Sequence, residues 1–133
     1  MKYLLDTDTC IYWLNGRDSV RNRLLAVGWA EVGICVITVA ELYFGAYNSN
    51  RVASNIERAE QFMRQLSVFP LDNNTLRRFG ELKSQLRRIE RPIANLDLLI
   101  ASVAVTNNMI LVTNNTRHYE RIGELKLENW IES

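Results

Sequence analysis

Three carboxylates stand where the surrounding sequence is apolar. Glu41 is the only charged residue in the stretch 34–47, and Asp97 is the only charged residue in the stretch 92–116. Asp6 directly follows a short apolar run near the N-terminus. A carboxylate in apolar surroundings costs several kcal/mol unless it is paired, hydrogen-bonded or bound to a cation. We therefore expect each of the three acids to have a compensating partner.

Helix capping is the alternative explanation for two of these positions. Asp6 or Asp8 could cap a helix that begins near Thr9, because aspartate is a common N-cap residue. Asp97 could cap the helix that follows it in the same way. Glu41 lies inside a predicted helix, so capping cannot explain it. The alternative explanation for Glu41 is a position on a solvent-exposed stripe of that helix.

The apolar pattern predicts the elements that must position these acids. Short apolar runs typical of buried strands lie at residues 3–5, 32–37, 68–71 and 110–112. Apolar periodicity predicts helices over residues 9–14, 20–27, 39–47, 52–66, 76–89 and 98–105. Short strands separated by helices imply a three-layer α/β/α sandwich with a central, mostly parallel, short-stranded sheet. Residues 1–133 contain no linker-like segment and are expected to form a single domain.

Such a sheet would bring the acids to one place. Asp6 would lie at the carboxyl end of the first strand, with Glu41 and Asp97 in or at the start of helices. Ligands of open α/β sheets bind in the crevice outside the carboxyl ends of the strands. Oxygen ligands select Mg²⁺ or Mn²⁺, while a single histidine and no CxxC spacing argue against zinc. Water bound to such a metal is a nucleophile for phosphodiesters, so we expect in-line phosphodiester hydrolysis.

The net charge of +1, taken alone, disfavours a nucleic-acid partner. The charges are unevenly distributed along the chain. Residues 51–91 hold nine basic and five acidic residues, whereas the rest of the chain holds seven basic and ten acidic residues. Arg87, Arg88 and Arg91 crowd the end of one predicted helix. We expect these arginines to bind the phosphate backbone of a nucleic acid and to guide it to the acidic site, because Asp97 follows them by only a few residues. The alternative is an ordinary solvated helix end with a favourable dipole interaction.

The sequence also predicts a compartment. No stretch approaches the roughly 18 to 20 uninterrupted apolar residues of a membrane span. The N-terminus meets an acid at Asp6, too early for a signal peptide. Cys10 and Cys35 lie in apolar surroundings without CxxC spacing, which is typical of reduced, buried thiols. We therefore expect a cytoplasmic protein, from a prokaryote by the resemblance described below, with no membrane partner.

The N-terminal string YLLDTDT is similar to the signature of haloacid-dehalogenase phosphatases, an apolar strand followed by DxDxT. In that hypothesis Asp6 would be a covalent nucleophile and Asp8 the acid/base. The second acid pair of such enzymes is missing, because Asp97 is the only acid between residues 92 and 116. The signature is therefore incomplete.

A second resemblance covers almost the whole chain. The chain contains, in order, the blocks YLLDTDTCIYWL, ITVAELYFGA, DLLIASVAV and ILVTNNTRHYERIGELKLENW. Together they resemble the motifs of PIN-domain ribonucleases, and specifically the VapC toxins of VapBC type II toxin–antitoxin modules. The resemblance implies an endoribonuclease that uses Mg²⁺, with Mn²⁺ as a substitute. It makes Asp6, Glu41 and Asp97 the metal-binding catalytic acids, the same three that stand out by their apolar surroundings.

The resemblance also identifies supporting positions. Many PIN domains carry a fourth acid in the turn after the last core strand, and here Asn115 or His118 stands in that region. This departure leaves open whether one metal ion binds or two, although Asn115 could hold a water or a phosphate. Thr7 and Thr113, at strand ends, are candidates for hydrogen-bonding support of the acids. We expect Asp8 to support the site or to cap the following helix.

Partners are implied by the same resemblance. The substrate would be a structured RNA, a tRNA among the candidates, cut to 5′-phosphate and 3′-hydroxyl ends. A homodimer is implied, as is a cognate VapB-type antitoxin whose C-terminal segment occupies the acidic pocket, with operator DNA bound only through the antitoxin. Candidates for the antitoxin contact, or for core packing, are Trp13, Tyr43, Phe44 and Tyr47. The alternative function is that of a catalytically weak PIN-like binding partner in a regulatory complex.

Overall fold

The computed structural model describes residues 2–131. Five short strands form one sheet in the order β3-β2-β1-β4-β5, and every neighbouring pair is parallel. The strands are β1 (Tyr3–Leu5), β2 (Val32–Cys35), β3 (Ser67–Phe69), β4 (Ile110–Val112) and β5 (Lys126–Glu128). The predicted α/β/α sandwich is confirmed, and over the described residues its sheet is wholly parallel.

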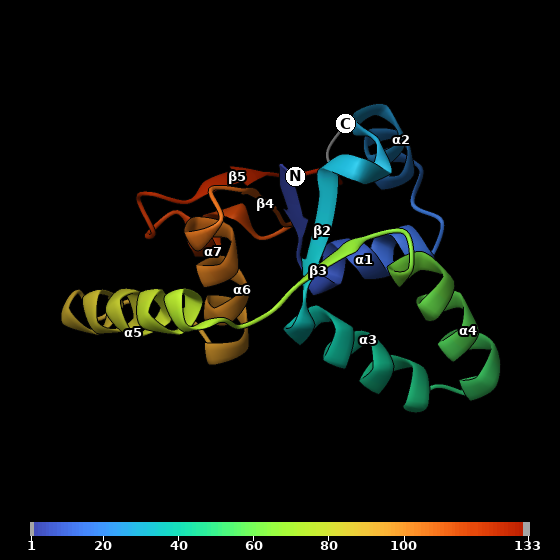
Figure 1. The fold of residues 1–133 in the computed structure, drawn as a ribbon, viewed down its shortest axis with the longest axis horizontal. Coiled ribbons are helices and arrows are strands. Elements are labelled where there is room, and N and C mark those ends of the chain that lie inside the picture. The colour runs from blue at the N-terminus through green and yellow to red at the C-terminus, as the bar shows by residue number, and fades with distance from the viewer. Residues whose placement is uncertain (1, 132–133) are drawn as a thin grey trace.

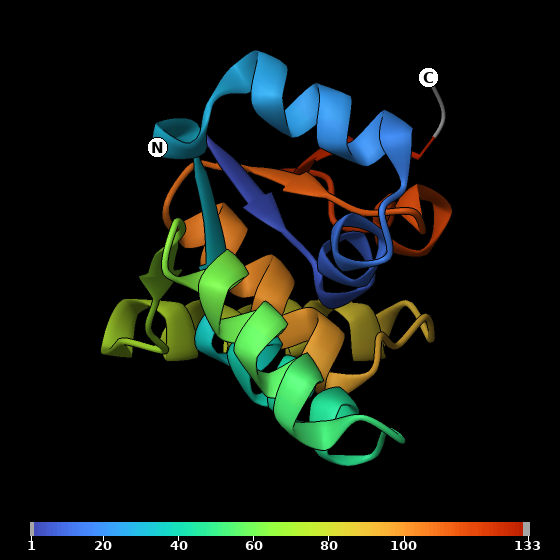
Figure 2. The same ribbon diagram turned by 90° about the vertical axis from the view of Figure 1, so that its right-hand side faces the viewer.

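Helices cover both faces of the sheet (Figure 1). They are α1 (Thr7–Leu14), α2 (Asp18–Val27), the 3₁₀ helix η1 (Trp29–Glu31), α3 (Val36–Tyr47), α4 (Val52–Met63), α5 (Asn73–Arg88), α6 (Asn95–Thr106) and α7 (Thr116–Tyr119). One hydrophobic cluster joins α5, α6 and α7 to the sheet, and a second joins α1, α2 and α4 to it. Helix α4, in green, crosses the side of the molecule that Figure 2 turns toward the viewer.

The central strand β1 contributes to both clusters. Leu4 belongs to the cluster that contains α5 and α6, whereas Tyr3 and Leu5 belong to the cluster that contains α1 and α2. Leu4 and Leu5 have no exposed surface. A parallel sheet that is covered on both faces requires apolar residues at every strand position. The strand therefore lacks alternation, and the first polar side chain after it, that of Asp6, lies at its carboxyl end.

Helix α3 begins earlier than the apolar pattern predicts. The predicted strand over 32–37 ends at Cys35, whose backbone is extended (φ −86°, ψ 151°) and whose Sγ accepts a hydrogen bond from the Ile37 N–H at 3.5 Å. The β-branched residues after Cys35 favour a strand by propensity, but the cap and the packing of the helix override this preference. The early start places Glu41 in the second turn of α3.

Two C-terminal elements were not predicted. Strand β5 pairs with β4 at the edge of the sheet and consists of Lys126, Leu127 and Glu128, none of which is fully buried. An edge strand with little buried surface needs no apolar run, so the pattern gives no signal for it. Helix α7 has four residues, too few to show helical periodicity.

The thiols lie as expected for a reduced protein. Cys10 and Cys35 are free and buried, and burial raises the pKa of both. Such thiols are chemically inert and act as small apolar side chains.

Between residues 2 and 131, none of the helices has the length and apolar character needed to cross a membrane.

Candidate active site

Asp6 joins the central strand to α1. Its side chain accepts a hydrogen bond from the Thr9 N–H at 2.8 Å and thereby caps α1, as one of the alternatives predicted. Its own N–H donates to the carbonyl of Val112 on β4 at 3.0 Å. The residue is only 8% exposed. A capping role therefore explains one hydrogen bond of Asp6 but leaves a buried carboxyl group at the end of the sheet.

The surroundings of Asp6 disfavour its negative charge. Burial raises the pKa of this carboxyl group, hydrogen bonds from Thr113 and Thr9 partly offset the rise, and the nearby charge of Asp8 adds to it. A cation beside Asp6 would remove this penalty. Asp8 itself is exposed in the first turn of α1, and the cap is Asp6, so the prediction that Asp8 caps the helix is wrong.

Glu41 reaches α1 from α3. The Thr7 hydroxyl donates a short hydrogen bond to Oε1 of Glu41, and the buried Thr38 hydroxyl lies 3.1 Å from that of Thr7. Since Thr7 follows Asp6 directly, this contact brings the second acid to the same end of the sheet as the first. The predicted support by Thr7 therefore takes the form of a contact with Glu41.

Asp97 lies in the first turn of α6. The helix begins at Asn95 with Ala94 as its N-cap, so the alternative that Asp97 caps the helix is wrong. Its side chain is 48% exposed, and its Oδ2 lies 3.8 Å from Nε2 of His118. The third acid is thus open to solvent and faces a side chain of α7.

Tyr119 is a buried residue near the acids that the sequence did not single out. This tyrosine is 2% exposed, and its ring packs edge to face on that of His118, with centroids 5.0 Å apart. Burial, followed by the negative charges of Asp97, Asp6 and Asp8, raises its pKa well above the ordinary value. Three carboxylates therefore act on one hydroxyl group. The residue type was the one sequence signal that could have pointed to Tyr119, because phenylalanine would fill the same core position without a hydroxyl group.

Thr113 and the turn after β4 complete the site. Thr113 is fully buried, and its hydroxyl accepts from the Asn115 N–H at 3.0 Å. Asn115 is exposed and has no side-chain capping bond. Of the two residues predicted near the position of a fourth acid, His118 is thus the one that faces Asp97.

The donor set fits a hard divalent cation by type. Over residues 2–131, however, no three His, Cys, Asp or Glu side chains are arranged to enclose a metal ion. Mg²⁺ keeps several waters in proteins and is commonly held by only one or two carboxylates together with substrate phosphates. Asp6, which is buried, and Asp97, whose side chain is 48% exposed, are carboxylates of the kind that hold Mg²⁺ in this way.

Comparison with known proteins assigns the family. Residues 3–125 match the PIN domain. The chain belongs to the PIN-domain family. It is 37% identical over 132 residues to "Ribonuclease VapC2" of Rickettsia felis, and 34% identical over 131 residues to "tRNA(fMet)-specific endonuclease VapC" of Shigella flexneri. Each alignment covers 98% of both chains, which places this PIN domain among the VapC proteins and confirms the predicted family.

A solved structure agrees with this assignment. The PIN domain superposes with a TM-score of 0.92 and 31% identity on a chain of the DNA-bound VapBC structure from Salmonella typhimurium, with 98% of both chains covered. Ribonucleases with a PIN domain are generally divalent-metal dependent. This dependence agrees with the oxygen-only donors of the site. The phosphatase alternative is not favoured, because the family match covers nearly the whole chain.

The three arginines predicted to bind a phosphate backbone lie at the end of α5. Arg87 and Arg88 occupy its last turn, Arg91 follows in the loop, and all three are exposed. Arg121 donates hydrogen bonds to the carbonyls of Arg91 and Pro92, which ties this loop to the segment after α7. Helix α5 packs against α6, the helix that carries Asp97. Within the described residues, none of the three arginines forms an ion pair.

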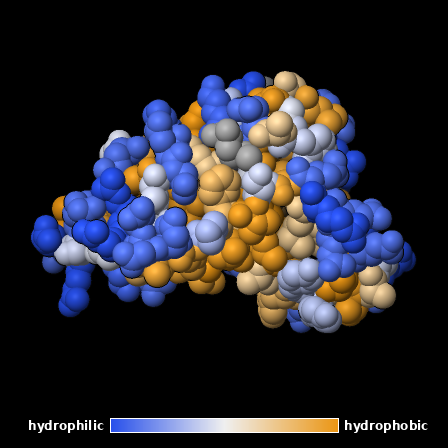
Figure 3. Space-filling view, in the orientation of Figure 1, coloured by the Kyte–Doolittle hydropathy of each residue, from blue (hydrophilic) through white to orange (hydrophobic). Residues whose placement is uncertain are grey.

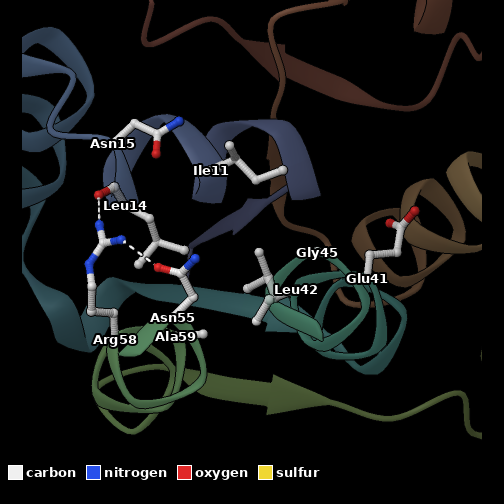
Figure 4. Close-up of a pocket in the computed structure, with 10 residues that line it drawn as sticks. Ile11, Leu14, Asn15, Glu41, Leu42, Gly45, Asn55, Arg58 and Ala59 are labelled. Atoms are coloured by element: carbon white, nitrogen blue, oxygen red, sulfur yellow. Dashed lines mark hydrogen bonds between the residues drawn. The ribbon is translucent and has the colours of Figure 1, made fainter. Parts of the chain in front are cut away.

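A pocket of about 190 Å³ opens between α1, α3 and α4 of the PIN domain (Figure 4). Its lining is mainly apolar and comprises Ile11, Leu14, Asn15, Glu41, Leu42, Gly45, Ala46, Asn55, Arg58 and Ala59. Arg58 crosses one side of it with hydrogen bonds to Leu14 and Asn55. In Figure 4 the carboxylate of Glu41 points away from Ile11 and Leu14. Glu41 therefore borders both the pocket and the acidic site.

The predicted contact aromatics separate into two groups. Trp13 packs against Trp29 and Phe62, with ring centroids 5.0 and 5.8 Å apart, and is part of the core. Tyr43 is half-buried and donates a hydrogen bond to Glu60 at 2.8 Å. In contrast, the two other candidates on α3 are 69% and 67% exposed, namely Phe44 and Tyr47. Only the latter pair leaves a large apolar surface open to a partner.

Proposed function

We propose that this VapC-family chain is an endoribonuclease toxin in which Asp6, Glu41 and Asp97 hold Mg²⁺, with Mn²⁺ as a substitute. The observation that carries the proposal is the buried Asp6 carboxyl group at the carboxyl end of the central strand, followed directly by Thr7, whose hydroxyl donates to Glu41. Endoribonuclease activity is the class of the named relatives across nearly their full length. Buried free thiols agree with a site of action in the cytoplasm.

Each residue of the proposed site has a separate role. A bound divalent cation supplies a more acidic water and neutralises charge on the phosphate. Asp6 provides a fixed carboxylate, since the Thr9 N–H holds its orientation. Asp97 provides an exposed carboxylate that an RNA backbone can approach. Thr7 holds Glu41 at the edge of the same site.

The proposed substrate is a structured RNA, with tRNA as the first candidate. Two relatives, from Shigella flexneri and Salmonella typhimurium, are named for tRNA(fMet), and others are named only as ribonucleases. The family resemblance implies 5′-phosphate and 3′-hydroxyl products, so the 3′ oxygen would be the leaving group when water attacks the phosphate. The exposed arginines at the end of α5 provide cations for the phosphate backbone outside the acidic site.

The proposed partners are a VapB-type antitoxin and a second copy of the chain. The superposable Salmonella structure is a VapBC complex bound to DNA, and we propose that this chain reaches operator DNA only through its antitoxin. The exposed Phe44 and Tyr47, beside the apolar pocket, form the surface proposed for the antitoxin. Figure 3 shows apolar surface gathered between α5 and α3, a face suited to homodimer contact.

We expect the purified chain to cleave tRNA in Mg²⁺ or Mn²⁺ and to lose cleavage in EDTA. Asp97→Asn keeps the size of the side chain but removes its charge, and we expect at least about a hundred-fold slower cleavage, because even groups that only support metal ligands are worth 10- to 100-fold. Gel mapping with end-group analysis measures both rate and products. Cleavage that survives Asp97→Asn would contradict the proposed site.

The same assay tests the alternative of a catalytically weak binding partner. That alternative is favoured by one observation, the absence of a three-ligand metal cluster between residues 2 and 131. It requires the wild-type chain to bind antitoxin without cutting RNA in any divalent metal. Measurable wild-type cleavage excludes it.

We expect charge reversal at Arg87 and Arg88 to weaken RNA binding and to flatten its salt dependence. Each lost phosphate contact lowers the slope of log K against log salt by about 0.7 for single strands and 0.9 for duplex nucleic acid. The double variant Arg87→Glu, Arg88→Glu is measured by fluorescence anisotropy between 50 and 200 mM KCl. Arg51→Glu, an exposed change before α4, is the control. An unchanged salt slope in the double variant would show that the arginines are an ordinary solvated helix end.

A further inference from the structure

Arg121 follows α7 and holds the loop that leads into α6. One nitrogen of its guanidinium group, Nη1, donates to the carbonyl oxygens of Arg91 and Pro92, at 3.0 and 2.9 Å. Hydrogen bonds from an ionised donor are about twice as strong as those between neutral groups. Through these two bonds, the segment after α7 holds the backbone a few residues before Asp97.

The start of α6 has no side-chain cap. Its N-cap residue is Ala94, whereas Asp6 caps α1 and Asp72 caps α5 through side-chain hydrogen bonds. A side-chain cap ties the residue before a helix to the first turn of that helix. The first turn of α6 carries Asp97. The position of this acid therefore depends on contacts between the start of α6 and the rest of the molecule.

The loop before α6 contains a residue in the left-handed region of backbone conformation. Glu90 has a φ of 56°, which costs free energy for any residue with a Cβ atom. Strained backbone persists only where the surrounding structure holds it. Ile93, which is 5% exposed, anchors the loop in the core, and Arg121 holds it where its backbone is exposed.

The same segment also contacts Asp97 itself. Nε2 of His118 lies 3.8 Å from Oδ2 of Asp97. Tyr119 and Ile122 are buried in the core cluster that includes residues of α6, and they fix the segment there. Residues 118–121 therefore contact both the loop before α6 and the acid in its first turn.

The stability of the fold does not explain an arginine at position 121. The Nε of Arg121 is buried and has no hydrogen-bond partner in the part of the chain that the structure describes. A buried donor without a partner costs free energy. The two acceptors belong to the exposed residues Arg91 and Pro92, so water could replace the guanidinium group there. Stability alone would therefore favour an apolar side chain of similar length.

We propose that Arg121 is a positioning residue, which holds the start of α6 so that Asp97 lies where the divalent metal binds. The inference rests on the proposed function, because that function assigns Asp97 to the metal. Arg121 contacts neither the metal nor the RNA in this role and acts through the backbone of the loop. Misplacement of a group in a catalytic site by about 1 Å can lower the rate about a hundred-fold. A small shift of α6 is therefore enough to be measured.

The test is Arg121→Met, which keeps a long side chain and removes the guanidinium group. We expect the dissociation constant for Mn²⁺, measured by electron paramagnetic resonance without RNA, to rise about ten-fold. Hydrogen exchange of the Leu98 amide, whose N–H donates to the Ala94 carbonyl in the first turn of α6, should become faster. The melting temperature in EDTA should change by less than about 4 °C, because the buried Nε is removed together with the two hydrogen bonds.

Arg78→Met is the matched control. Arg78 also joins α5 to the segment after α7, with ion pairs to Glu81 at 2.8 Å and to Glu124 at 3.8 Å, but neither pair involves the loop before α6. This variant should bind Mn²⁺ like the wild type and leave the exchange of Leu98 unchanged. Arg121→Lys keeps a cation that can donate to the same carbonyls and should restore part of the lost Mn²⁺ affinity.

A double-mutant cycle separates positioning from general structure. In an Asp97→Asn background, Arg121→Met should cause no further loss of Mn²⁺ affinity, because the carboxylate that it positions is gone. Additive losses, or a much larger fall in melting temperature than expected, would mean that Arg121 acts through overall packing, and the inference would be overturned. Wild-type Mn²⁺ affinity in Arg121→Met would overturn it while leaving the proposed function standing. Failure of the wild-type chain to bind Mn²⁺ would overturn both.

Discussion

Asp6→Asn should reduce RNA cleavage by at least about a hundred-fold and, in the absence of metal, should make the folded protein more stable. The loss of activity follows from removing the one buried negative charge at the carboxyl end of β1, since a direct metal ligand is worth more than the 10- to 100-fold of its supporting groups. The gain in stability follows from the penalty that burial imposes on that charge. Asparagine is as good an N-cap as aspartate, so α1 should keep its start.

The pH dependence of this stability effect has a defined sign. Because burial raises the pKa of Asp6 in the folded state, the protonated acid favours folding relative to the ionised acid. Its contribution is complete below the ordinary pKa of 3.8 and is lost as the pH rises through the raised folded value. The stability advantage of Asp6→Asn should therefore be small at about pH 3 and larger at pH 7. Urea unfolding in EDTA at both values measures it.

Metal addition provides the control for Asp6→Asn. Excess Mg²⁺ or Mn²⁺ should stabilise the wild-type chain, because a ligand that binds only the folded state raises the free energy of unfolding. The variant should gain little. Asp72→Asn is a matched surface change, because Asp72 also caps a helix but is exposed. An Asp6→Asn variant that cleaves RNA at the wild-type rate would contradict the metal site proposed for the end of β1.

Gly45→Leu should weaken neutralisation by the antitoxin while RNA cleavage by the free chain is retained. Gly45 is exposed, lines the pocket between α1, α3 and α4, and has no heavy atom within 4 Å of the place where a Cβ would stand. Leucine is also about 1 kcal/mol more favourable than glycine inside a helix, so α3 should not be disturbed. The added side chain would instead occupy space that the antitoxin is proposed to fill.

The expected size of the effect follows from overpacking an interface. Extra methylene groups in a well-packed site cost about 1–3 kcal/mol, equivalent to roughly 5- to 150-fold in affinity. Titration of antitoxin into a cleavage assay, together with calorimetry, measures the loss. Gly80→Leu is the matched control, since Gly80 is an exposed helical glycine of α5 with the same free space. Equal neutralisation of the two variants would place the antitoxin elsewhere.

The amino-acid pattern predicted the sheet and the acids for identifiable reasons. Asp6, Glu41 and Asp97 stand out because each interrupts an apolar stretch, and burial at both faces of β1 requires such stretches. The strand 3–5 and the strand 110–112 were predicted with the bounds that the structure has. Their neighbours on both faces are helices whose apolar stripes are long enough to show periodicity.

Other features depend on contacts that local sequence does not encode. The start of α3 depends on the Cys35 sulfur, and a β-branched run masks it. The approach of His118 to Asp97 depends on a four-residue helix, which is too short to show periodicity. Trp13 was a candidate for an exposed contact, but its position among Trp29 and Phe62 is decided by the packing of three elements. A single amino-acid sequence gives little information about tertiary contacts of this kind.

The pairing of β1 with β4 also governs when the site can form during synthesis. Tyr3 pairs with Ile110, and the Asp6 N–H donates to the carbonyl of Val112, so residues from opposite ends of the chain build the centre of the sheet. A ribosome adding 5–20 residues per second needs roughly 5 to 20 s to make the intervening segment. Throughout that time Asp6 lacks the neighbouring strand, whose Val112 carbonyl accepts its N–H. A nascent toxin of this design is therefore expected to remain harmless until its last strands emerge.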